Sequence, residues 1–385
     1  MQKTLFVENT AVFLANTDAA GVLSDTGKKI HKPVLSKAVT GTYTPYVDIV
    51  SKQQSSAQQT LTVDTFKYGF EEIDWTDKRQ TSNYNPVEFS AQSMQKGLNN
   101  LVEQAFLSKI TSAKNVIDGS SFGGAASSLV NFTGPTIFDV FESADSRLGS
   151  VDAPYDNRVA VLGPHAVSAI RKLKSQRETP LGDTILQNGV ISTWNGWMIV
   201  QNNNLPYTAV FGLATLPTDG DTVKIANVTF TFKTALSGVA GQVLIGGSAA
   251  AALTNLLAAI AGTGVVGTNY IELAVEDIFI LRSKRNVSGT IATTNLTITG
   301  YGDIVVSSAL TNAVDGWSGQ KQDSYFGLRG AIDLVVQINP NDIRIIEKEK
   351  GFADLVKSLL GFGVYMFDDG ARVSIDAKLD ASLWK

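Results

Sequence analysis

One stretch of this chain predicts a long helix that any fold has to accommodate. Asn85 is a favourable N-cap, Pro86 follows at the first helical position, and Glu88 completes a capping-box pattern. Apolar side chains then recur at helical spacing as far as residue 113. They include Val87, Met94, Leu98, Leu101 and Ala105. Residues 85–113 at about 1.5 Å each would make a rod of about 40 Å, which needs a long surface to pack against.

The residues before this helix do not read as an ordinary core. Residues 1–29 carry scattered apolar side chains broken by Gly, Asp and Thr, which predicts an extended arm with one short helix. Residues 61–74 alternate as a strand, which would place Leu61, Val63 and Thr65 on one face and Phe66, Tyr68 and Phe70 on the other. A two-stranded ribbon is marginal in water, so we expect this one to rest on another chain. The alternative is a disordered N-terminal region.

The rest of the chain predicts an α+β protein. Helices are expected over residues 136–148, 163–176, 181–188, 248–261 and 352–360. Strands are expected over 159–162, 190–194, 197–201, 222–225, 228–233, 270–282, 290–299, 330–339 and 343–346, with a closing hairpin over 362–375. The Asn195-Gly196 pair between two apolar strands is a strong hairpin signal.

The density of charged residues drops sharply in the middle of the chain. Residues 206–312 hold six acidic and five basic side chains in 107 residues, about half the density of the remainder. The segment begins near Asp219-Gly220-Asp221 and contains a helix capped by Ser248 and stopped by Gly262. We interpret it as a small inserted α+β domain.

Composition excludes several classes of function. The formal charge of −4 does not suit a polybasic nucleic-acid binder. The chain has no cysteine, which excludes disulfides and thiolate sites, and only two histidines, which excludes a His-rich metal site. Residues 1–21 lack the apolar run of a signal peptide. The longest Ala/Leu stretch, 248–262, is too short to span a bilayer.

No catalytic, cofactor or metal constellation stands out. The Gly-rich stretches 119–124 and 238–247 lack the Gly-Lys-Ser/Thr ending of a phosphate loop. His165, in the first turn of a predicted helix, has no accompanying Ser or carboxylate motif, and His31 lies in the arm. The neighbouring carboxylates Glu71-Glu72 and Glu276-Asp277 would lie on strands with their side chains on opposite faces, and Asp368-Asp369-Gly370 would form a turn. We therefore expect no enzyme.

Trp194 and Trp197 flank the Asn195-Gly196 turn. They read either as a cross-strand pair that packs the hairpin or as an anchor for a partner chain. Packing is the default interpretation, because aromatic cross-strand pairs are ordinary sheet contacts.

The order of these elements resembles the major capsid proteins of tailed bacteriophages, with the Hong Kong 97-type coat fold. Residues 61–64 and 73–77 resemble that family's N-arm and extended loop, and the capped helix from Asn85 resembles its spine helix. The run from Asp152 to Pro164 resembles the start of its central domain. Residues 189–206, 329–346 and 361–375 resemble its paired and returning strands.

The resemblance implies five parts. They are an N-terminal arm (1–34), an extended loop (35–84), the spine helix with the first part of the peripheral and axial domains (85–205), an insertion domain (206–312) and the returning strands (313–385). Some family members carry an insertion in this region. Surface decoration, a folding aid and contact between capsomers all stay open as its role.

The resemblance also implies a function. Subunits would form hexamers and pentamers of an icosahedral shell that encloses DNA without binding its sequence, in the virion, after assembly in the host bacterial cytoplasm. The partners implied are further copies of the chain, portal and scaffolding proteins, and decoration proteins, with no membrane. The chain begins with Met1, so we expect scaffolding from a separate protein.

The ribbon and arm that lack a core would lie across neighbouring subunits. The candidate inter-subunit residues are Phe66, Lys67, Tyr68, Phe70, Trp75, Lys78, Trp194 and Trp197. Lys67 and Lys78 are also formal candidates for the Lys–Asn isopeptide bond of some family members, but the sequence names no partner Asn and no assisting Glu. We therefore expect no such bond.

Two other functions compete with the capsid hypothesis. A tail component or adhesion protein is suggested by the insertion, but not by the long helix and ribbon. An enzyme, for example a hydrolase that uses His165, would require a pocket around that residue.

Overall fold

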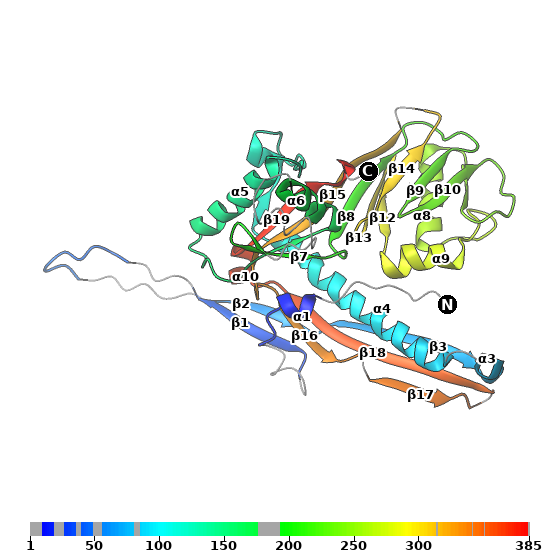
Figure 1. Ribbon diagram of the computed structural model, residues 1–385, viewed down its shortest axis with the longest axis horizontal. Coiled ribbons are helices and arrows are strands. Elements are labelled where there is room, and N and C mark those ends of the chain that lie inside the picture. Colours follow the sequence, from blue (N-terminus) through cyan, green and yellow to red (C-terminus); the bar gives the residue numbers. More distant parts are fainter. Residues whose placement is uncertain are drawn as a thin grey trace.

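The computed structural model describes residues 10–18, 27–35, 40–48, 56–80, 85–175, 193–312, 315–340, 342–349 and 351–383. Figure 1 shows a body of several sheets crossed by one long helix, with a thin two-stranded ribbon reaching away from it. The helix predicted over 181–188 lies outside the described residues. No helix in the described ranges is both long and apolar enough to cross a membrane.

The long helix is α4 (Pro86–Ser108), which continues as the 3₁₀ turn η1 (Lys109–Ser112). Asn85 caps it by accepting a hydrogen bond from the Val87 backbone N–H at 3.2 Å, rather than from the Glu88 N–H that a capping box would use. Pro86 occupies the first helical position, as predicted. The sequence signals for the start of this helix are therefore confirmed.

A four-stranded sheet lies along α4. Its strands are β3 (Thr65–Asp74), β16 (Asp333–Ile338), β17 (Ile343–Glu347) and β18 (Ala353–Tyr365). Strand β18 pairs with β3 on one side and with β16 and β17 on the other. Leu98 and Phe106 of α4 join Leu360 and Phe362 of β18 in one buried cluster, so α4 covers one face of this sheet.

Two predictions for the C-terminal residues are wrong. Residues 352–360, expected as a helix, belong to β18, where alternate side chains such as Val356 and Leu360 are buried while Lys357 and Leu359 are exposed. The spacing of Val356 and Leu360 also fits a helix, and pairing with three strands decides the outcome. The closing hairpin over 362–375 is also wrong. Helix α10 (Asp368–Arg372) occupies the expected turn, and the next strand pairs with another sheet.

The ribbon consists of β1 (Lys29–Leu35) and β2 (Ser56–Thr62), paired in register from Lys29↔Thr62 to Leu35↔Ser56 (Figure 1). The single strand predicted over 61–74 breaks at Val63 and Asp64, so β2 belongs to the ribbon and β3 to the sheet under α4. At this break Leu61 and Val63 are buried against Val335 and Phe367. The buried side chains therefore anchor the base of the ribbon, and at its middle Gln59 accepts a hydrogen bond from the Asp368 backbone N–H at 2.9 Å. The short helix predicted in the arm is α1 (Ala11–Leu14).

A second, nine-stranded sheet forms the centre of the molecule. Its strands are β4 (Asn115–Ile117), β5 (Arg158–Leu162), β6 (Thr193–Trp194), β7 (Trp197–Gln201), β8 (Pro206–Gly212), β12 (Ser288–Ala292), β13 (Asn295–Tyr301), β15 (Gly316–Leu328) and β19 (Ser374–Asp380). The order is β12-β13-β8-β15-β5-β7-β6, and β19 lies between β15 and β4. The predicted Asn195-Gly196 hairpin joins β6 to β7, with φ of 50° and 78° at the two turn residues.

Helices cover both faces of this central sheet. Helices α5 (Thr136–Ser150) and α6 (Pro164–Ser175), both predicted, bury Phe141 and Ile170 with Phe326 on one face. On the other face Val161 and Tyr325 join the cluster of α4. Helix α4 thus packs on two sheets at once. The remaining short turns are η2 (Gly119–Phe122) and η4 (Ala381–Leu383).

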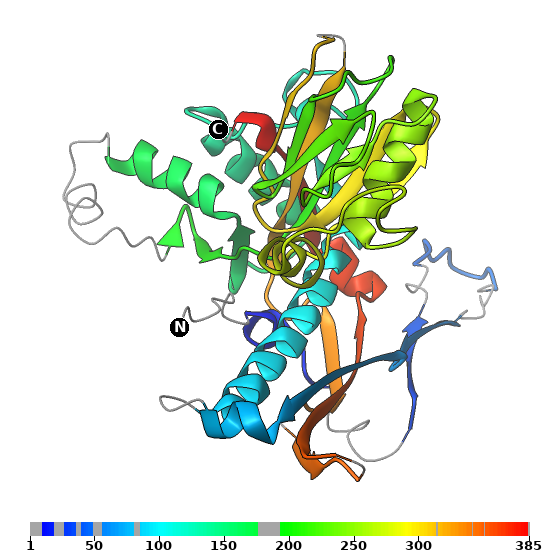
Figure 2. The same cartoon turned by 90° about the vertical axis from the view of Figure 1, so that its right-hand side faces the viewer.

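The low-charge segment has a core of its own. A four-stranded sheet of its own has the order β11-β10-β9-β14. Its strands are β9 (Thr222–Ile225), β10 (Val228–Lys233), β11 (Gln242–Leu244) and β14 (Val306–Ala309). Helix α8 (Ala249–Ala261) packs there, capped by Ser248 and ended by Gly262 as predicted. Strand β8 pairs with β15, so the segment also continues the central sheet, as Figure 2 shows from the side.

The strand predicted over 270–282 is wrong. Helix α9 (Val275–Ile278) and a π-helical turn, η3 (Phe279–Lys284), occupy this region. Glu276 and Asp277 lie in the first turn, where carboxylates favour a helix, so the pair is not on a strand. Arg282 donates to the carbonyls of Ala259 and Ile260 at the end of α8. The strand predicted over 290–299 is a hairpin, β12 and β13.

A buried carboxylate joins the arm, the long helix and the central sheet. Glu103 of α4 is fully buried. Its Oε1 accepts from the backbone N–H of Thr10 at 2.5 Å, the Thr10 hydroxyl at 2.9 Å and the Asn202 amide at 2.9 Å. Its Oε2 accepts from the Asn204 amide at 2.6 Å. The sequence analysis did not identify this node.

The same face of α4 reaches the low-charge segment. The amides of Asn100 and Gln104 both donate to the carbonyl oxygen of Lys284, at 3.4 and 2.9 Å. Next to this contact, Arg285 donates to the Asn203 carbonyl at 3.2 Å. Helix α4 is therefore bonded to the arm, the loop after β7 and the 206–312 segment.

We expect Glu103→Ala to lower the free energy of unfolding by about 3 kcal/mol, because the four donor groups of Thr10, Asn202 and Asn204 would lose this acceptor. Urea unfolding followed by circular dichroism measures this loss. The control is Glu88→Ala, an exposed carboxylate of the same helix, which should cost less than about 1 kcal/mol. Equal unfolding midpoints for the two variants would contradict the role given to Glu103.

Candidate inter-subunit surface

Among the described residues, nothing covers the face of the sheet opposite α4, and this face carries aromatic side chains. On β3 the side chains of Phe66, Tyr68 and Phe70 are 51%, 79% and 53% exposed. They point away from α4, because the intervening Gly69 packs against it: a Cβ there would lie 2.2 Å from Met94 Cγ. The alternation predicted for this strand is confirmed, and its aromatic side lies in the open.

The neighbouring strand extends the apolar surface. Leu359, which pairs with Tyr68, is 44% exposed, and Lys357 pairs with Phe70. Gly361 pairs with Phe66, and a Cβ on it would approach the Phe66 ring to 2.9 Å, so the missing side chain makes room for the ring. We define the open face as Phe66, Tyr68 and Phe70 of β3 with Lys357 and Leu359 of β18.

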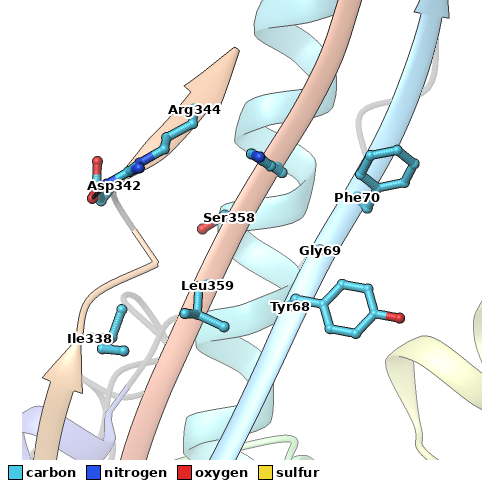
Figure 3. Close-up of a pocket in the computed structure, with 9 residues that line it drawn as sticks. Tyr68, Gly69, Phe70, Ile338, Asp342, Arg344, Ser358 and Leu359 are labelled. Carbon is cyan, nitrogen blue, oxygen red and sulfur yellow. Dashed lines mark ion pairs between the residues drawn. The ribbon is translucent and has the colours of Figure 1, made fainter. Parts of the chain in front are cut away.

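Part of the open face is hollowed. Figure 3 shows Tyr68, Phe70, Leu359 and Ile338 around a hollow of about 590 Å³, seen from the side opposite α4. Arg344 and Asp342 lie at its edge and are both exposed; the Arg344 Nη2 and Asp342 Oδ2 atoms are 3.9 Å apart. Lys357 adds a second cation. The hollow therefore offers an apolar floor with two cations and one carboxylate around it.

Trp75 and Lys78 both bind Asp354 of the same chain. They lie on α3 (Trp75–Gln80), where the Trp75 indole donates to Asp354 Oδ1 at 3.2 Å and the Lys78 ammonium to Asp354 Oδ2 at 2.9 Å. The hydrogen bonds from Lys78 and then Trp75 hold the pKa of Asp354 below its usual value. Phe352, which stacks on Trp75 at 5.5 Å between ring centroids, is 75% exposed. This corner could contact a neighbour through Phe352.

Lys67 lies apart from the open face. It is exposed, and it pairs in the sheet with Leu360, whose side chain is buried with α4. Its side chain therefore leaves β3 on the side opposite Tyr68.

Trp197 is not available to a partner. It is fully buried and lies 5.5 Å from the Phe326 ring. Trp194 is half-buried and packs 5.0 Å from the rings of both Phe138 and Phe141. The packing interpretation of this pair is confirmed. Its place among the inter-subunit candidates is wrong for Trp197, because the hairpin folds back onto α5.

The two histidines have separate surroundings. His165 Nε2 is hydrogen-bonded to Asp303, which ties the start of α6 to the loop after β13. His31 Nδ1 lies 2.8 Å from the Thr60 hydroxyl across the ribbon. Within the described parts of the chain, no group of three or more His, Cys, Asp or Glu side chains could hold a metal ion.

Sequence reasoning missed the β18 and β17 half of this surface. The sequence analysis does not propose Leu359 and Lys357, because residues 352–360 read as a helix. Arg344 lies on the correctly predicted strand 343–346, but nothing in the sequence places it beside Tyr68. A usable signal was present: Leu355, Lys357 and Leu359 alternate with Val356, Ser358 and Leu360, as expected for a strand with one covered face.

Comparison with known proteins establishes the fold. No protein-family model matches the sequence, and no curated protein matches it. Among solved structures, a chain of Mycobacterium phage Che8 matches with a TM-score of 0.56 and 13% identity, over 99% of this chain and 94% of that one. The capsid of Cyanophage P-SCSP1u matches with a TM-score of 0.52 and 11% identity, over 98% of this chain and 89% of that one. The capsid of Myoviridae phage XM1 matches with a TM-score of 0.50 and 8% identity, over 98% of this chain and 94% of that one. The chain has the Hong Kong 97-type capsid fold, as the resemblance implied.

The α3 corner should respond to acid. Because the folded pKa of Asp354 is lowered, its carboxylate stabilises the fold above the ordinary Asp pKa, and this contribution is lost as pH falls through the folded value. At about pH 7 the unmodified protein should therefore unfold at higher urea than Asp354→Asn, and near pH 2.5 the two midpoints should converge. Asp342→Asn, an exposed control, should match the unmodified protein at both values. A difference between the unmodified protein and Asp354→Asn that persists in acid would contradict the assignment.

Proposed function

We propose that this chain is the major capsid protein of a tailed bacteriophage, which assembles with copies of itself into hexamers and pentamers of an icosahedral shell. The observation that carries the proposal is the likeness over 98–99% of the chain to the capsid of Cyanophage P-SCSP1u and a chain of Mycobacterium phage Che8. The likeness extends over nearly the whole of this chain and over 89–94% of those two chains, so it covers more than a common module. Low identity limits what is shared to the fold.

The ribbon supports an assembling subunit. It leaves the body without a core of its own, and its buried contacts lie only at its base, around Leu61 and Val63 (Figure 1). Two-stranded ribbons are marginal in water. In a shell, a neighbouring copy supplies the missing surface.

The tip of the ribbon and the open face complement each other. In residues 40–48 the side chains of Tyr43 and Val47 are 67% and 61% exposed, and Tyr46 is fully exposed. Asp48 follows them, also exposed. The open face of a neighbouring copy offers an apolar floor for these side chains and, in Arg344 and Lys357, cations for the carboxylate. We therefore assign the open face as the seat of a neighbour's ribbon tip.

The remaining partners follow from the same proposal. The shell would enclose DNA without reading its sequence, which suits a net charge of −4. Scaffolding, portal and decoration proteins would act on it in the host cytoplasm, and the finished chain would reside in the virion. The five-part division of the chain, with 206–312 as an insertion domain, also stays part of the proposal.

The competing functions have less support. No observation favours a tail component, since the matched structures with printed descriptions are capsids. For an enzyme, the His165–Asp303 contact is explained by its position between α6 and the 206–312 segment. We propose no catalytic role.

Negative-stain electron microscopy of the purified chain, alone and with its phage scaffolding protein, tests the proposal. Closed shells, or rings of five and six subunits, are expected. Tubes or trimeric fibres would favour a tail component. A monodisperse monomer under all conditions would contradict self-assembly.

The open face should matter for assembly and not for folding. We expect the double variant Tyr68→Ser, Phe70→Ser to raise the protein concentration needed for assembly at least about tenfold. Burial of each aromatic side chain at a contact would stabilise that contact by about 1.5–3 kcal/mol. Light scattering measures this threshold. Urea unfolding of the monomer should change little, since both rings are exposed.

The control is Val275→Ser, an apolar side chain of the 206–312 segment that is 82% exposed. It should leave the assembly threshold unchanged. If the Tyr68/Phe70 variant assembles at the unmodified threshold, the open face is not a subunit contact.

A further inference from the structure

Two carboxylates are buried side by side where the C-terminal strand joins the central sheet. Asp323 of β15 is 1% exposed and Asp376 of β19 is 3% exposed. In the antiparallel register Asp323 pairs with Lys378, and Tyr325 pairs with Asp376. The two aspartates therefore sit on the same side of the sheet, diagonally across one step of the ladder.

Their hydrogen bonding is incomplete. Asp376 Oδ1 has no hydrogen-bond partner in the described part of the chain. Asp323 Oδ1 lies 3.1 Å from the Lys321 ammonium, but it too lacks a well-directed hydrogen bond among these residues. A buried carboxylate without donors is costly when ionised and tolerable when protonated.

The surrounding charges do not remove this cost. Lys321 and Lys378 favour the ionised form of both aspartates. Against this, burial raises the pKa of Asp323, and burial followed by the Asp323 carboxylate raises the pKa of Asp376 to about 7. A pair of this kind holds one proton at acidic pH and gives it up near neutrality.

The other elements packed against these two strands add few titratable groups. Strand β4 and turn η4 have none, and β19 itself also carries Asp380. Those on the remaining neighbours are Lys109 on η1, Tyr207 on β8, Arg158 on β5, and Asp368, Asp369 and Arg372 on α10. Arg158 pairs with Asp145, and Asp368 with Lys114 and Arg372.

Strand β19 is the joint between two parts of the body. On one side it pairs with β15 over seven residues, from Lys321↔Asp380 to Gly327↔Ser374. On the other side it pairs with β4 and exchanges backbone hydrogen bonds of 2.9 Å with Val130. Loosening of β19 would therefore release residues 115–130 from the central sheet.

We propose that Asp323 and Asp376 form a protonation switch: one proton held by this pair keeps β19 docked, and its loss loosens β19 from β15 and β4. The proton passes to solvent, leaving two carboxylates that repel each other across the ladder. The switch belongs to the fold of the single chain and does not depend on the proposed function.

Hydrogen–deuterium exchange of the full chain at pH 6 and pH 8, corrected for intrinsic exchange rates, tests the switch. Peptides covering β19 and β4 should lose about tenfold in protection between the two values, as linkage to a folded-state pKa of about 7 predicts. Sedimentation velocity ensures that one assembly state is compared. A change of less than about twofold in the unmodified protein would overturn the proposal without any variant.

Variants locate the effect. Asp376→Asn should abolish the pH-dependence between pH 6 and pH 8, because it removes the group whose pKa lies at about 7. Asp323→Asn should reduce it, because the repulsion is lost while burial still raises the pKa of Asp376. Asp380→Asn, on the same strand and half-buried, should keep it. Persistence of the tenfold change in both Asp376→Asn and Asp323→Asn would overturn the assignment to this pair.

Discussion

The buried carboxylate of Glu103 is the constraint on which the arrangement of this fold depends. A buried carboxyl group is tolerated only when hydrogen-bond partners satisfy it, and here the donors come from Thr10, Asn202 and Asn204 rather than from a cation. These three residues belong to the arm and to the loop after β7, on opposite sides of α4 in the sequence. The helix can therefore be buried at this point only after the arm and the central sheet have both arrived. One polar node in an otherwise apolar stripe thus fixes the position of α4 relative to its neighbours.

The rest of the molecule divides its apolar residues between closed cores and surfaces left open. Helix α4 packs on the central sheet through Val161 and Tyr325, and on the four-stranded sheet of β3, β16, β17 and β18 through Leu360 and Phe362. On the opposite face of the four-stranded sheet, Tyr68 and Leu359 are exposed, and no helix of the described residues covers them. The ribbon likewise ends in exposed aromatic side chains. A chain that left both surfaces in water would gain nothing from them and would risk association through them. Under the proposed function, a neighbouring copy would cover these surfaces and offset that cost.

The sequence predicts those elements whose signals are local. The cap at Asn85, the Asn195-Gly196 hairpin, helix α8 between Ser248 and Gly262, and the alternation of Phe66, Tyr68 and Phe70 are all found as expected. Failures occur where pairing partners far along the chain decide. Residues 352–360 fit a helix by spacing, but they belong to strand β18 because β3 and β17 flank them. The Glu103 node was invisible for the same reason: a carboxylate within an apolar stripe is explained only by residues about a hundred positions away. The β18 part of the candidate surface, Lys357 and Leu359, was missed because that strand was predicted as a helix.

The topology assigns a folding task to the 206–312 segment. The central strand β15 pairs with β8, β5 and β19, yet it follows β8 by more than a hundred residues, so closing that loop carries an entropic cost. The segment would reduce the cost by folding around one core, which runs from Tyr207 of β8 to Val306 of β14. Its hairpin β12–β13 pairs with β8, and Gly212 and Gly316 end directly opposite each other. Once the segment is folded, the start of β15 already lies beside β8. Of the roles open for an insertion here, a folding aid is the one for which the strand register supplies a physical reason, since the large central sheet cannot be completed until β15 is delivered to its middle.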